Sequence, residues 1–160
     1  MINIPYVPFY FVRHGQTDWN KTNHTLCDQD DIQLNEAGLL QASHACKKII
    51  SLDITKIYSS PLMRAQQTAE IINKVLNVSL EFHDGLREIS PEKIAATFAE
   101  ILQPTHIPLI VSHGEVYRLL LRILNAQATD LNAKNCGVYF FSPSVADSNQ
   151  WVVNVLDHSD

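Results

Sequence analysis

The sequence predicts an α/β domain built on a largely parallel sheet. Short apolar runs of strand length alternate along the chain with segments whose apolar residues recur at helical spacing, and this alternation is typical of such a sheet. With 160 residues, 46% of them hydrophobic, the chain is long enough to bury a substantial core. No linker-like or low-complexity stretch divides it, so we expect residues 1–160 to form a single domain.

Composition and charge disfavour several functional classes. The formal net charge is −5 and no run of Lys or Arg exceeds two residues, which argues against a nucleic-acid partner. The apolar stretches are too short for a transmembrane helix, and the apolar N-terminus carries Pro5 and Pro8 without a basic leader, so we expect neither membrane association nor a secretion signal. Three widely spaced cysteines, Cys27, Cys46 and Cys136, lack a C-x-x-C pair and suit a reducing, cytoplasmic location.

A polar segment separates the first predicted strand from the first long helix. Residues 9–12 are apolar and stop abruptly at Arg13, as expected of a buried strand that meets a loop. Residues 18–33 are polar and irregular. Apolar side chains then recur at helical spacing from Leu39 to Ile50, which predicts a helix with Asn35 as its N-cap.

Strands and helices continue to alternate through the middle of the chain. Residues 54–58 predict a second strand, and Ser59-Ser60-Pro61 supply a cap and a first-turn proline for a helix that extends to Leu76. Residues 78–82 predict a third strand, which ends at Asp84-Gly85.

The last part of the chain predicts two helices and three strands. A helix of about ten residues is expected from Pro91. A fourth strand at 109–111 leads into a helix over residues 114–124 with one apolar face. Residues 138–141 and 151–155 predict closing strands.

Reactive side chains follow four of the predicted strands. In a parallel sheet the ligand site lies beyond the carboxyl ends of the strands, so these side chains are expected to converge. They are Arg13 and His14 after the first strand, Arg64 one turn into the next helix, Glu88 after the third strand and His113 after the fourth.

This combination of residue types describes a pocket for a phosphate dianion. The planar guanidinium of arginine matches phosphate oxygens, and helix N-termini add backbone N–H donors. A neutral imidazole is a competent nucleophile toward phosphorus, and a nearby glutamate can protonate the leaving oxygen. Because arginines can stabilise the charge of the transition state, we expect no metal and no cofactor.

Four ordered motifs also carry a resemblance to a known family. The segment from Val12 to Asn20, VRHGQTDWN, resembles the signature of the histidine phosphatase superfamily, the phosphoglycerate mutase-like proteins. The segments SSPLMRAQQTA, LRE and VSHG resemble the motifs that follow in that family, in the same order, and the similarity covers residues 9 to about 125. The resemblance implies a three-layer α/β/α sandwich.

The resemblance also implies a role for each of the five convergent residues. His14 would be the nucleophile that becomes phosphohistidine, while Arg13, Arg64 and His113 would bind the phosphoryl group. Glu88 would protonate the leaving group and then activate water. The implied activity is that of a metal-independent phosphoric monoester hydrolase acting on a phosphorylated small molecule or a phosphoprotein.

Two further contacts and two departures from the family pattern bear on specificity. Asn20 lies where the family often places an additional phosphate contact, and Thr17 is close to it in sequence. Asp28 stands where mutase-like members usually have glycine, which disfavours a second phosphate. Only 24 residues separate Glu88 from His113, where larger members carry a long insertion, so we expect an open site that favours hydrolysis over mutase action.

Other interpretations remain open at this point. The same fold could act as a protein phosphohistidine phosphatase, as a phosphoglycerate mutase or as a non-catalytic phosphate-binding protein. A metal-dependent phosphohydrolase would instead use His83 and Asp84 with His44 and an aspartate such as Asp130. Glu88 could also simply pair with its neighbour in the chain. The oligomeric state is not predicted.

Several charged residues are expected to lie on the surface without a role in catalysis. Arg118 and Arg122 lie one turn apart on a predicted helix, with Glu115 as a partner for Arg118. Four histidines outside the motifs are also expected on the surface: His24, His44, His106 and His158.

Overall fold

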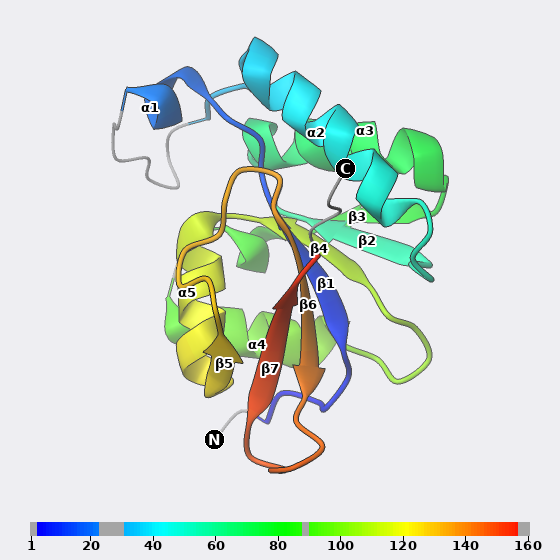
Figure 1. Ribbon diagram of the computed structural model, residues 1–160, viewed down its shortest axis with the longest axis vertical. Coiled ribbons are helices and arrows are strands. Elements are labelled where there is room, and N and C mark those ends of the chain that lie inside the picture. Colours follow the sequence, from blue (N-terminus) through cyan, green and yellow to red (C-terminus); the bar gives the residue numbers. More distant parts are fainter. Residues whose placement is uncertain (1–2, 23–30, 88–89, 157–160) are drawn as a thin grey trace.

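A seven-stranded sheet forms the centre of the computed structural model, which describes residues 3–22, 31–87 and 90–156 (Figure 1). The strand order is β3-β2-β4-β1-β6-β7-β5. Neighbouring strands run parallel except where β6 pairs with β1 and with β7, so the predicted α/β class with a mostly parallel sheet is confirmed. The strands are β1 (Phe9–Arg13), β2 (Lys56–Ser59), β3 (Ser79–Phe82), β4 (Leu109–Ser112), β5 (Ala126–Ala128), β6 (Val138–Pro143) and β7 (Trp151–Val155).

Helices cover both faces of this sheet and complete the three layers. The helices are α1 (Asp18–Lys21), α2 (Glu36–Ile49), α3 (Met63–Leu76), α4 (Pro91–Ile101) and α5 (Gly114–Ile123), with a 3₁₀ turn at Asp84–Leu86. Figure 1 shows α2 and α3 on one side of the sheet and α4 and α5 on the other. No helix among the described residues is long and apolar enough to cross a membrane.

Successive side chains of β1 point to opposite faces of the sheet and so contribute to two separate hydrophobic clusters. Phe9 and Phe11 are fully buried in the cluster that includes the apolar side chains of α4 and α5. Val12 points to the opposite face, where it joins the cluster formed with α2 and α3. A strand buried on both faces explains why residues 9–12 are continuously apolar.

The predicted start of α2 is confirmed, but its predicted apolar face is partly wrong. The Asn35 side chain accepts a hydrogen bond of 2.9 Å from the Gly38 amide, as an N-cap residue should. Leu39 and Ile50, expected in the core, are exposed. Ala42 and Ile49 of the predicted face are buried, and Gly38 is buried as well, because at this position the helix packs against the backbone of Gln16.

Three other local features differ from the sequence predictions. The N-cap of α3 is Leu62 rather than a residue of Ser59-Ser60-Pro61; the Ser60 hydroxyl accepts from the Leu62 amide at 3.3 Å and also lies 2.8 Å from His113 Nε2. The short helix α1 lies within the segment expected to be irregular, and β5 was not expected. Both are shorter than the window from which periodicity can be read.

Candidate active site

The parallel pairing of β1 with β4 brings the two predicted histidines together. In this register Arg13 lies opposite Ser112, and the His14 amide donates a hydrogen bond of 3.0 Å to the Ser112 carbonyl. His14 and His113 therefore leave adjacent strand ends, and their ring centroids are 5.4 Å apart. Both side chains are almost completely buried.

The end of β2 supplies the next part of the site. The Ser60 amide donates to the Val111 carbonyl at 3.0 Å, so Ser60 continues alongside β4 beyond the end of β2. Its hydroxyl lies 2.8 Å from His113 Nε2. Arg64, in the first turn of α3, is fully buried.

The hydrogen bond of His14 fixes which ring nitrogen carries the proton. His14 Nδ1 lies 2.7 Å from the Gly15 carbonyl oxygen. A carbonyl oxygen can only accept, so Nδ1 carries the hydrogen in the neutral ring and Nε2 holds the lone pair. This is the tautomer that a nucleophilic Nε2 requires.

Electrostatics keep both histidines neutral. Burial, the largest cause, and the charges of Arg64 and Arg13 lower the pKa of His14 to about 3, against the opposing effect of its hydrogen bond to Gly15. Burial also lowers the pKa of His113 well below its usual value, followed by the effects of His14, Arg64, Arg13 and Arg87. The positive potential that disfavours imidazolium in this site favours a bound dianion.

Arg13 is fixed by contacts on two sides. Its Nη1 donates to the Ala133 carbonyl at 2.9 Å. Gly114, the first residue of α5, packs against the guanidinium. A Cβ at this position would lie only 3.3 Å from Arg13 Nε. The missing side chain of Gly114 lets the helix N-terminus approach the site closely.

Thr17 and Asn20 are engaged with each other in a capping box. Asn20 Oδ1 accepts from the Thr17 amide at 3.1 Å, and Thr17 Oγ1 accepts from the Asn20 amide at 3.2 Å. In the structure both side chains therefore stabilise the start of α1. The predicted contact of Thr17 and Asn20 with phosphate stays a prediction. Glu88 and Asp28 lie outside the described residues.

The segment between β5 and β6 contributes to the site in a way that no motif indicated. Asn135 Nδ2 donates to the His14 carbonyl at 3.0 Å, and the Cys136 amide donates to the Arg13 carbonyl at 2.9 Å. Arg87 was also absent from the predicted site, although its charge acts on His113. Its Nη1 lies 3.7 Å from Asp84 Oδ1.

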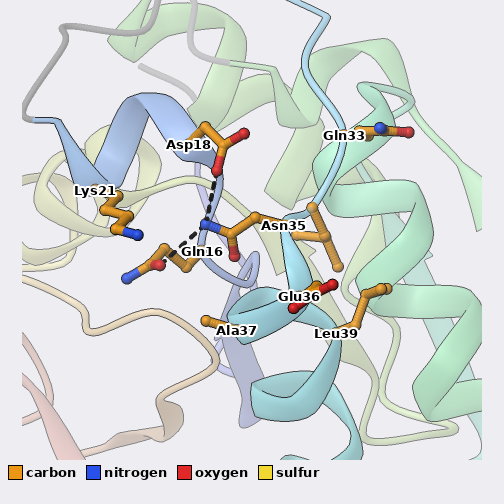
Figure 2. Close-up of a pocket in the computed structure, with 9 residues that line it drawn as sticks. Gln16, Asp18, Lys21, Gln33, Asn35, Glu36, Ala37 and Leu39 are labelled. Carbon is orange, nitrogen blue, oxygen red and sulfur yellow. Dashed lines mark hydrogen bonds between the residues drawn. The ribbon is translucent and has the colours of Figure 1, made fainter.

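A polar pocket of about 590 Å³ lies between α1 and the start of α2 (Figure 2). Asn35 Nδ2 donates to Gln16 Oε1 at 3.0 Å and to Asp18 Oδ1 at 3.3 Å, and Lys21 lies on the α1 side. None of the convergent residues that the structure describes, Arg13, His14, Arg64 and His113, lines this pocket.

The structure does not assemble the alternative metal site. Among the described residues no three His, Cys, Asp or Glu side chains come together in a group that could hold a metal ion. His83 instead caps the 3₁₀ turn, its Nδ1 accepting from the Gly85 amide at 3.0 Å. His44 is exposed on α2, as predicted.

The remaining surface predictions have mixed outcomes. Arg118 pairs with Glu115 as predicted, and Arg122 Nη2 lies 3.9 Å from the same glutamate. His106 is only partly exposed, contrary to expectation, because it lies in the turn that leads into β4 and bonds Thr105 Oγ1 at 3.1 Å. The predictions for His24 and His158 lie outside the described residues.

Comparison with known sequences identifies one family. The family model of the histidine phosphatase superfamily (branch 1) matches residues 9–106. The chain is 40% identical over 80 residues to a probable phosphoglycerate mutase GpmB of Salmonella choleraesuis, and 33% identical over 109 residues to one of Escherichia coli O139:H28. These matches cover 50% and 68% of this chain but 37% and 46% of the relatives, so the chain spans less than half of their length.

Solved structures show the same fold at low sequence identity. Phosphoglycerate mutase from Bacillus anthracis superposes with a TM-score of 0.78 at 20% identity, covering 93% of this chain and 92% of that one. A mycobacterial glucosyl-3-phosphoglycerate phosphatase gives a TM-score of 0.72 at 18% identity, covering 96% and 100%. Both support the three-layer architecture around the site.

Proposed function

Because the chain belongs to the histidine phosphatase superfamily, we propose that it is a metal-independent phosphatase that hydrolyses phosphomonoesters through a phosphohistidine at His14. The observation that carries the proposal is the state of His14. The ring is neutral, its proton is committed to the Gly15 carbonyl, and Nε2 holds the lone pair. A buried neutral imidazole in a positive potential can attack a bound dianion without first losing a proton.

The first step transfers the phosphoryl group to the protein. His14 Nε2 forms a bond to phosphorus as the bond from phosphorus to the ester oxygen breaks. Arg13 and Arg64 would stabilise the negative charge of the equatorial oxygens, and His113 would donate a hydrogen bond to one of them. The Nδ1–H bond to Gly15 supports the positive charge that the ring gains on phosphorylation.

Glu88 is the proposed proton carrier in both steps. In the first it gives a proton to the departing alkoxide, and in the second it takes one from the water that attacks phosphohistidine. Glu88→Gln should therefore reduce turnover of alkyl phosphates by roughly 10²–10⁴-fold. For aryl phosphates the value of kcat/KM, which reports the transfer to His14, should fall much less, since their leaving groups need less protonation. Equal losses of kcat/KM with both substrates would count against the role as acid, whereas kcat should fall for both because attack by water also needs Glu88.

The proposed activity is compatible with more than one kind of phosphorylated substrate. The structural relatives named above include a glucosyl-3-phosphoglycerate phosphatase, which is consistent with a phosphorylated small molecule. The short segment between Glu88 and His113 also leaves room for a phosphoprotein or for phosphohistidine itself. A second candidate function is phosphoglycerate mutase, because the curated relatives carry that name. A third is phosphate binding without turnover.

The proposal is tested by phosphate release from 4-nitrophenyl phosphate, with and without excess EDTA. Wild-type protein and His44→Ala, an exposed histidine on α2, should show equal activity that EDTA does not change. His14→Ala should show none. Activity that EDTA abolishes, or that survives in His14→Ala, would contradict the mechanism. Tight phosphate binding by wild type without any release would favour a binding protein.

A further inference from the structure

The peptide group between His14 and Gly15 is held at both ends by side chains from distant parts of the chain. Asn135 Nδ2 donates to the His14 carbonyl at 3.0 Å. The Gly15 amide, at the other end of the same peptide, donates to Thr68 Oγ1 at 3.0 Å. Thr68 lies on α3 and Asn135 lies between β5 and β6. We call these two side chains the peptide clamp.

The clamp acts at a place where the backbone has unusual freedom. Gly15 follows the proposed nucleophile, and glycine accepts backbone angles that other residues resist, so rotation of this peptide carries little intrinsic cost. The Gly15 carbonyl, which is the acceptor for His14 Nδ1, belongs to the next peptide but is attached to the same Gly15 Cα, so a shift of the clamped peptide changes its distance from the imidazole. Loss of that acceptor would release both the orientation of the imidazole and its tautomer.

Each half of the clamp is itself oriented. Thr68 Oγ1 donates its hydrogen to the Arg64 carbonyl at 2.8 Å, which leaves an oxygen lone pair for the Gly15 amide. Thr68 is fully buried, so no competing water reaches this bond from solvent.

The segment that carries Asn135 is tied down nearby. The Lys134 amide donates to the Tyr139 hydroxyl at 2.9 Å, and the Cys136 amide donates to the Arg13 carbonyl at 2.9 Å. Asn135 is thus presented to the strand end by backbone contacts on both of its sides.

We propose that Thr68 and Asn135 are positioning residues that fix the His14–Gly15 peptide and so hold His14 as the Nδ1–H tautomer with Nε2 available to phosphorus. This inference rests on the proposed role of His14. Neither residue needs to touch the substrate, so their loss should lower kcat and leave KM nearly unchanged.

A double-mutant cycle tests this coupling. Thr68→Val removes the acceptor with little change of shape, and Asn135→Ala removes the donor. Each should lower kcat for 4-nitrophenyl phosphate by about tenfold, the scale of one buried hydrogen bond. The double variant should lose less than the product of the two effects, because either change alone already frees the same peptide. Thr68→Ser should restore most of the activity.

Nuclear magnetic resonance of ¹⁵N-labelled histidine gives a readout that needs no turnover. Wild-type His14 should show a protonated Nδ1, whereas both variants should show a mixture of tautomers. Asn132→Ala, which removes a surface acceptor of Arg118 in the same segment, should match wild type in both measurements. If Thr68→Val fails to fold, Asn135→Ala on the half-buried segment carries the test.

Unchanged tautomers in the variants, or effects on kcat that multiply in the double variant, would overturn the clamp. An inactive wild-type protein would contradict the proposed function instead, and the tautomer measurement would still decide whether the clamp orients His14.

Discussion

The two buried histidines link the chemistry of the site to the pH dependence of folding. The unfolded chain protonates its histidines near their ordinary pKa of about 6.5, whereas folded His14 does so only at about 3. Between these values the unfolded state binds more protons, so the free energy of unfolding must fall as the pH falls. His113 shifts in the same direction and adds to the effect.

This dependence can be measured by urea unfolding in phosphate-free buffer. His14→Asn removes one of the two groups, so it should lose about 2 kcal/mol less stability than wild type between pH 7 and pH 5. His44→Asn, at an exposed position, should behave as wild type. Equal losses in wild type and His14→Asn would show that His14 is not held neutral by the fold.

At the scale of residues, the sequence predicted the reactive groups better than their supports. Arg13, His14, Arg64 and His113 follow recognisable motifs, and the structure brings them together at one edge of the sheet. The contact of Ser60 with His113 spans 53 positions, and that of Asn135 with His14 spans 121. Contacts between residues so far apart in the sequence depend on the complete topology of the fold, which cannot be predicted from a local sequence pattern.

At the scale of elements, the loop after β1 depends on close contact with α2. A Cβ on Gly38 would lie 2.2 Å from the Gln16 carbonyl oxygen, and a Cβ on Gly15 would lie 2.6 Å from the Gly38 carbonyl oxygen. Two glycines therefore let the helix meet the backbone of the loop that follows the proposed nucleophile. The contact explains why the large apolar residues of α2 near this end face outward.

Gly38→Ala tests this contact directly. Alanine is normally favoured over glycine inside a helix by about 1 kcal/mol, so a loss of stability must come from the contact with the loop. We expect destabilisation of about 1–3 kcal/mol, seen as a lower Tm, together with reduced kcat. Ser43→Ala at an exposed position of the same helix should lower neither the Tm nor kcat. A Gly38→Ala protein as stable and active as wild type would show that the loop is not constrained there.

Helix and strand positions were predictable where the pattern was long. The helices α2, α3, α4 and α5 bury apolar faces at helical spacing, and the strands β1 and β4 are continuous apolar runs. The predicted start of α3 was wrong because the Ser60 hydroxyl, although it accepts from the Leu62 amide at 3.3 Å, lies before the N-cap Leu62 and also contacts His113. A polar residue used by the site cannot be told from a cap by sequence alone.

At the scale of the whole molecule, topology decides which strand ends share an edge. The alternation of strands and helices predicted the parallel part of the sheet, and with it the meeting of β2, β4 and β1. The antiparallel placement of β6 beside β1 was not predictable, because it depends on how the chain returns after α5. This return is what brings Asn135 to the strand end.

The length of the segment between Glu88 and His113 predicts the outcome of the reaction. Of these 24 residues, α4 and β4 occupy most, which leaves little chain to cover the site. A mutase must protect its phosphohistidine from water, whereas a phosphatase must expose it. With 3-phosphoglycerate as substrate, we therefore expect phosphate release to exceed formation of 2-phosphoglycerate. Faster isomerisation than release would assign the chain to mutase action.

The most direct measurement of the central claim is the capture of the phosphorylated protein. Glu88→Gln mixed with an activated aryl phosphate and quenched in alkali should accumulate the intermediate, because the leaving group needs little protonation while attack by water is slowed. Mass spectrometry should then find one acid-labile phosphoryl group on His14, and none in the His14→Ala, Glu88→Gln protein. A phosphoryl group on another residue, or phosphate release that continues without His14, would contradict the account.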